Sequence, residues 1–226
     1  MSSVYFVVCT LVIAAATPLE QAQVLEQGGD DPAAIALLQK AVTADPRWAI
    51  GRVELGRLQL KQGASAAAFE QLDIARSLAP ENPRAHYLFA LAADEAGHRN
   101  ESRRALEVAL ALRAGYSDAQ VRLAGVLAAE GDYRSAAATL RAYLGSHPEA
   151  NGTRLQLADA LERSGDHAGA ERELRALLQV TALKVLASRR LLTLLDAQGR
   201  SGEAQRVRLA LDPPKRQLRE LQPSRR

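Results

Sequence analysis

Glycine recurs at a fixed interval along nearly the whole chain. Six of the 15 glycines among the 226 residues are 34 positions apart, and they are Gly29, Gly63, Gly97, Gly131, Gly165 and Gly199. Such regularity indicates one structural unit repeated in tandem. The low aromatic content of 4% also fits a repeat array better than one large globule.

Apolar residues flank each glycine at helical spacing. The residue five positions after the glycine is small, and the six are Ala34, Ala68, Ser102, Ala136, Ala170 and Ala204. The residue nine positions after it is leucine in five units, Leu38, Leu72, Leu106, Leu140 and Leu174, with Arg208 in the sixth. The pattern predicts two antiparallel helices per unit, joined by a glycine turn, with small residues that allow close helix packing.

Prolines mark the ends of several units. Pro46, Pro80 and Pro148 each follow the repeat glycine by 17 positions and are expected to end the second helix. Ala114 and Ala182 replace proline in two units, where we expect the successive helices to be less sharply separated.

The segments GGDDPAAIALLQKAVTADP (28–46) and LGRLQLKQGASAAAFEQLDIARSLAP (55–80) resemble the tetratricopeptide repeat. The resemblance extends over residues 17–212, and it implies an all-α fold, a right-handed superhelix (α-solenoid) of about six helix-turn-helix repeats. Other residues replace the family's frequent tryptophan near the start of the first helix, namely Pro18, Arg52, His86, Gln120, Arg154 and Ser188. Thr17, Pro18 and Glu20 predict a capping box, so the array is expected to begin at Thr17.

The first 16 residues form a separate segment. The apolar run from Val4 to Ala16 is shorter than the roughly 20 residues of a spanning helix but matches a signal-peptide core, and Ala14–Ala16 suit cleavage before Thr17. No Lys or Arg precedes the run. Residues 1–16 are therefore interpreted as a signal peptide or membrane tether, which implies a periplasmic or inner-membrane-tethered protein. The alternative is a buried helix of a cytoplasmic protein.

Residues 213–226 are basic, with five cationic side chains against Glu220. This segment carries a formal charge of +4, whereas the whole chain carries +3. The rest of the chain therefore has a net charge of −1 and is nearly neutral. That distribution argues against a nucleic-acid partner. We expect a basic C-terminal cap or tail, with possible weak membrane contact here or at the N-terminal segment.

No pattern of catalytic residues is present. The chain has one cysteine, Cys9, four scattered histidines and no nucleotide-binding or hydrolase motif. We therefore expect no enzyme activity, metal or cofactor. An alternative is a regulatory or substrate-recruiting module of an enzyme, as a subunit or a fragment of a longer chain.

The resemblance also implies a concave groove lined by the first helices. Asn82, Asn100 and Asn151 fall outside the groove positions, which argues against a carboxylate clamp. The residues expected to bind a partner are Val53, Arg57, Arg84, Tyr87, Leu91, Val121, Arg122 and Leu155. They would hold a peptide or helix of a partner protein, with Tyr87 as the anchor and the arginines facing acidic side chains. Alternatively, the apolar members pack against neighbouring helices. The predicted function is an interaction scaffold or adaptor, with a role in envelope complex assembly or secretion.

Overall fold

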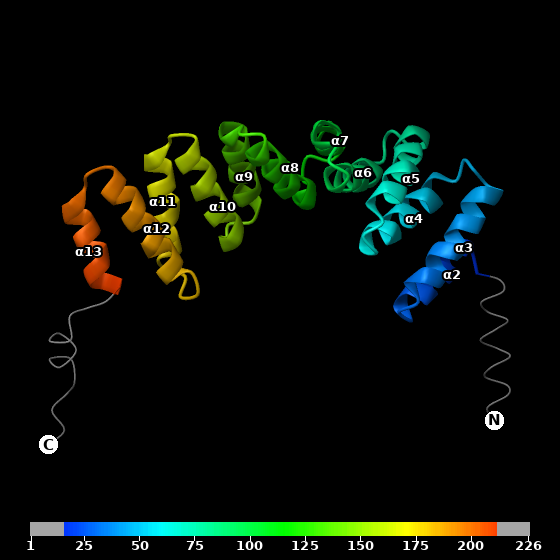
Figure 1. The fold of residues 1–226 in the computed structure, drawn as a ribbon, viewed down its shortest axis with the longest axis horizontal. Helices are drawn as coiled ribbons and strands as arrows, with labels where there is room; N and C mark the ends of the chain where they lie inside the picture. Colours follow the sequence, from blue (N-terminus) through cyan, green and yellow to red (C-terminus); the bar gives the residue numbers. More distant parts are fainter. Residues whose placement is uncertain (1–15, 212–226) are drawn as a thin grey trace, which may run out of the picture. The chain divides into compact units, whose positions relative to one another are not determined.

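The computed structural model describes residues 16–211, which are helical throughout apart from short turns, with no strand in that range (Figure 1). The twelve helices of these residues are α2 (Pro18–Gln27), α3 (Asp31–Ala44), α4 (Ala49–Lys61), α5 (Ser65–Leu78), α6 (Pro83–Glu95), α7 (Arg99–Leu112), α8 (Ser117–Ala129), α9 (Tyr133–Ser146), α10 (Asn151–Arg163), α11 (His167–Leu177), α12 (Lys184–Ala197) and α13 (Ser201–Leu211). The interpretations of residues 1–15 and 213–226 lie outside the described residues.

The six repeat glycines form the turns within the helical hairpins, as predicted. Their φ angles lie between +71° and +87°, a region that L-residues with a side chain rarely adopt. After each glycine the next backbone N–H closes the preceding helix: that of Asp132, for example, bonds to the carbonyl of Leu127 at 2.9 Å. A Cβ at these glycines would meet nothing within 4 Å, so backbone conformation alone requires glycine there.

The small and large apolar residues pack between the helices of each hairpin. Ala34, Leu38, Ala68 and Leu72 are all fully buried. Gly56 on α4 shows how close the helices come, because a Cβ there would lie 2.4 Å from Cγ of Leu72 on α5.

The helix ends follow the sequence signals closely. Thr17 caps α2 in the predicted capping box: its backbone N–H donates to Glu20 Oε2 at 2.7 Å, and its Oγ1 accepts the Glu20 N–H. Helices α3, α5 and α9 end two residues before their prolines. Helix α7 ends at the equivalent residue without a proline, whereas α11 ends earlier, at Leu177, and turns lead to α12.

In five of the six units a polar side chain occupies the position where the family often has tryptophan, and Pro18 occupies it in the first. Three of these polar side chains reach back to the carbonyl oxygen of the proline six residues earlier: Arg52 to Pro46 at 3.0 Å, His86 to Pro80 at 2.9 Å and Arg154 to Pro148 at 2.8 Å. Each bond ties the first helix of one repeat to the end of the preceding repeat.

The chain divides into two compact units. Unit 1 comprises residues 1–119 and unit 2 comprises residues 120–226. In unit 1 the described helices α2 to α7 pack against their neighbours along the sequence, and α4 also contacts α6. In unit 2, α9 to α13 pack in the same sequential manner.

Candidate functional site

Ion pairs connect the first helices of unit 1. Arg57 on α4 donates to both carboxylate oxygens of Glu26 on α2, at 2.9 and 2.5 Å, and its Nε donates to Glu54 at 2.7 Å. Glu54 in turn accepts from Arg84 on α6 at 2.5 Å. Lys61 adds bonds to Glu26 at 3.2 Å and to Asp31 at 2.9 Å. We call this chain of charged residues the unit 1 ladder.

The ion pairs of the unit 1 ladder stabilise the charged forms of their members. The hydrogen bonds from Arg57, followed by those from Lys61, lower the pKa of Glu26 to about 2 although partial burial opposes the shift. The same bonds raise the pKa of Arg57 above its ordinary value. Two of the arginines predicted to face a partner, Arg57 and Arg84, therefore already have carboxylate partners within the chain.

The predicted apolar contacts of unit 1 differ in exposure. Val53 is only 2% exposed because α4 packs against α3, α5 and α6. Val53 is therefore a core residue, which corrects its prediction as a partner contact. Leu91 is half-buried. Tyr87 is also half-buried, and the centroid of its ring lies 4.9 Å from that of the Tyr116 ring, with the two planes tilted by 46°.

In unit 2 the first helices form a hollow of about 340 Å³, called here the groove hollow. Its lining residues come from α8, α9, α10 and α12, and they are Ala124, Gly125, Ala128, Leu140, Leu155, Gln156, Asp159, Ala160 and Arg190. The floor is apolar, since Ala124, Leu140 and Ala160 are buried. The space exists because α8 presents only Ala and Gly to it.

The polar edge of the groove hollow is pre-organised. Arg190 on α12 donates to Asp159 at 2.6 Å and to Glu162 at 3.1 Å, both on α10. Asp159 and Gln156 add acceptor and donor groups next to the apolar floor. A peptide side chain entering the hollow would meet apolar walls first and hydrogen-bonding groups at the edge.

Of the predicted residues in unit 2, the structure places Leu155 in this hollow. Val121 is half-buried and Arg122 is exposed on α8, and neither lines it. The residues expected to bind a partner did not include Gly125, Ala128 and Arg190, although Gly125 and Ala128 stand at groove positions of the repeat. The small residues at groove positions were the available signal for the first two. Arg190 lies nine positions before Gly199, the repeat position that Gln156 and the predicted Arg122 occupy before their own glycines, so the 34-residue register was the available signal for it.

The described residues hold no group of three or more His, Cys, Asp or Glu side chains suited to a metal ion. Within residues 16–211, no helix combines the length and the apolar character needed to cross a bilayer.

Comparison with known proteins points to one family. Residues 87–151 match the family model described as a tetratricopeptide repeat. No curated protein is similar enough in sequence to match the chain. The fold is similar to that of MamA, with a TM-score of 0.67, 22% identity, and coverage of 73% of this chain and 96% of that one.

Two further solved structures have the same fold. One is YrrB, described as a TPR protein with an unusual peptide-binding site, with a TM-score of 0.67, 17% identity and coverage of 75% and 88% of the two chains. The other is a tetratricopeptide repeat protein from Parabacteroides merdae, with a TM-score of 0.67, 17% identity and coverage of 87% and 79%. Residues 87–151 are thus tetratricopeptide repeats by sequence, and the 34-residue period and the all-α fold show the same repeat architecture throughout residues 16–211.

Proposed function

We propose that this protein is a scaffold that binds a segment of a partner protein in the groove hollow of unit 2. The observation that carries the proposal is the hollow itself, about 340 Å³ of space at groove positions, with an apolar floor and a polar edge. Its volume suits one or two apolar side chains of a peptide or helix. The peptide-binding site named for YrrB, which has the same fold, also supports this function.

The proposal locates the contact in unit 2 rather than at Tyr87 and Arg84. In unit 1 the charged groove residues are engaged by the unit 1 ladder, so a partner would have to compete with carboxylates already in place. In unit 2 Arg190 is ion-paired as well, but an apolar side chain could enter the hollow beside it without displacing those ion pairs. Because the hollow is preformed, little ordering of the protein would oppose binding.

A role in envelope assembly or secretion is part of the same proposal. Its support is the apolar run of residues 4–16, which has the length of a signal-peptide core, directly before the capping box at Thr17. In that setting the scaffold would bind a subunit of an envelope complex.

The test fills the groove hollow by substitution. A displayed library of short peptides is selected on the full chain, and the selected peptides are then titrated against Gly125→Phe by calorimetry. No heavy atom lies within 4 Å of a Cβ at Gly125, so the phenylalanine can enter the hollow without a backbone clash. We expect affinity to fall by about tenfold or more.

Gly145→Phe is the matched control. Gly145 is also an exposed helical glycine with nothing within 4 Å of its Cβ, but it does not line the hollow. The Gly145→Phe variant should bind the same peptides with the affinity of the native protein. Equal binding by the native protein and Gly125→Phe would refute the groove hollow as the binding site.

A further inference from the structure

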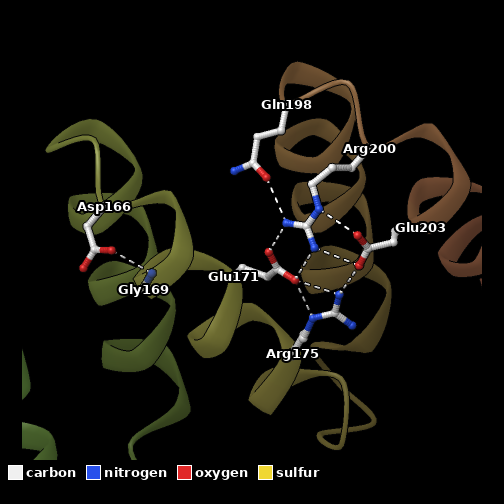
Figure 2. A network of polar contacts seen from close by, with 7 residues as sticks. All are labelled: Asp166, Gly169, Glu171, Arg175, Gln198, Arg200 and Glu203. Carbon is white, nitrogen blue, oxygen red and sulfur yellow. Dashed lines mark hydrogen bonds and ion pairs between the residues drawn. The ribbon is translucent and has the colours of Figure 1, made fainter.

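A second surface of unit 2 can be understood by comparing two successive repeat junctions. At the later junction, Glu171 on α11 lies between two guanidinium groups (Figure 2). Arg175 contacts its Oε1 at 2.7 Å, and Arg200 contacts its Oε2 at 2.5 Å. Both arginines also reach Glu203 on α13, at 3.2 and 2.7 Å. These contacts outweigh partial burial and lower the pKa of Glu171.

The junction one repeat earlier has no carboxylate at the position of Glu171. Thirty-four residues before Glu171, Arg175 and Arg200 stand Ala137, Arg141 and Asp166. Because Ala137 lacks the length of a glutamate side chain, a hollow of about 420 Å³ remains, called here the turn hollow. Helix α9, the end of α10 and the α10–α11 turn line it, and the lining residues are Arg134, Ala137, Arg141, Leu161, Ser164, Gly165 and Asp166.

The turn hollow has an excess of positive charge. Among residues 16–211, no hydrogen bond or ion pair engages the guanidinium of Arg134 or Arg141, both of which are exposed. Asp166 is the one carboxylate in the lining. Its Oδ1 accepts the N–H of Gly169 at 2.8 Å and so caps α11 (Figure 2).

We propose that the turn hollow binds an Asp or Glu side chain of a partner protein, in the place that Glu171 occupies at the next junction. The carboxylate would accept hydrogen bonds from Arg141, as Glu171 does from Arg175, and Arg134 would supply the second positive charge. The ligand is a carboxylate because a carboxylate already fills the equivalent space within this chain. The turn hollow and the groove hollow share no lining residue, so this interaction is independent of the proposed function.

The experiment titrates the full chain with a fluorescein-labelled peptide of alternating Glu and Ser, at low salt, by fluorescence anisotropy. The same peptide with Gln in place of Glu is the reference ligand. Changing Arg134→Gln and Arg141→Gln together should weaken binding of the Glu peptide by about tenfold or more. Arg206→Gln and Arg189→Gln together make the same change of charge at exposed residues outside the hollow, and should weaken it by less than about twofold.

A gain-of-contact variant tests the comparison of the two junctions directly. Ala137→Glu places the protein's own carboxylate in the hollow, so it should remove binding of the Glu peptide and raise the melting temperature. If this variant does not fold by circular dichroism, the paired arginine changes still decide the question.

Two results would overturn the proposal. One is equal affinity of the native protein and the Arg134→Gln/Arg141→Gln variant for the Glu peptide. The other is full displacement of the peptide by inorganic phosphate but not by chloride at matched ionic strength, which would assign the hollow to a phosphate group instead.

Discussion

Arg57 on α4 donates to both carboxylate oxygens of Glu26 on α2, a residue 31 positions earlier in the chain. This contact holds the pKa of Glu26 at about 2, below its ordinary 4.5. A carboxyl group with a lowered pKa in the folded state stabilises the fold above its unfolded pKa, and this stabilisation is lost as the pH falls through the folded pKa.

Glu26→Gln should therefore lower the free energy of unfolding at neutral pH, by about 1–2 kcal/mol. The difference from the native protein should shrink between about pH 4.5 and pH 2. Urea unfolding of both proteins at several pH values measures this difference in the free energy of unfolding. Glu70→Gln, at an exposed residue, should stay within about 0.5 kcal/mol of the native protein throughout. A Glu26→Gln difference that persists unchanged at the lowest pH would contradict the prediction.

Two helical glycines should respond in opposite directions to alanine. Gly56→Ala places a Cβ 2.4 Å from Leu72 Cγ, whereas a Cβ at Gly125 meets nothing within 4 Å. We expect the first change to lower the free energy of unfolding by about 1–3 kcal/mol through overpacking. The second should raise it by about 0.5–1 kcal/mol, since alanine loses less backbone entropy. Denaturant titration distinguishes them, and a shift of the same sign in both would show that the close contact at Gly56 does not matter.

Arg154 should matter more for stability than a typical surface arginine. Its guanidinium donates to the Pro148 carbonyl and to Glu173 on α11, both at 2.8 Å. Arg154→Ala should lower the free energy of unfolding by about 1–3 kcal/mol, because both acceptors lose a charged donor. Arg172→Ala, at an exposed position on α11, is the control and should change it by less than about 0.5 kcal/mol. Thermal melts of both variants provide the measurement, and equal melting temperatures would argue against a role for the Arg154 bonds.

Tyr87 and Tyr116 should be energetically coupled through their ring contact at 4.9 Å. A double-mutant cycle of Tyr87→Ala and Tyr116→Ala, measured by urea unfolding, should give a coupling energy of about 0.5–1.5 kcal/mol. Additive effects within about 0.3 kcal/mol would mean that the rings do not stabilise each other, and Tyr87 would again be a candidate for a partner contact.

Export makes a prediction about the mature N-terminus. If residues 1–16 are a signal peptide, the protein recovered from an envelope fraction should begin at Thr17 and contain no cysteine, because Cys9 leaves with the peptide. N-terminal sequencing and a thiol assay of the native protein check this. Intact Met1 on protein from a cytoplasmic fraction would exclude cleavage and export.

The features that the sequence determined by itself are those set by a few neighbouring residues. The repeat glycines have positive φ at the predicted turns, and Thr17 and Glu20 form the predicted capping box. Backbone conformation, capping and proline breaks depend on local steric and hydrogen-bonding rules, so their positions could be read from the order of residues. Repetition at 34 residues then implied the packing of each hairpin on the next.

Only the tertiary structure decided which groove residues are accessible and which are already paired. Val53 is buried, Arg57 is held by a carboxylate from the preceding repeat, and space remains beside Gly125. The difference between Ala137 and Glu171 likewise becomes meaningful only when the arginines around each position are seen. These outcomes depend on the length and direction of side chains that meet across about one repeat of sequence, and local rules do not specify them.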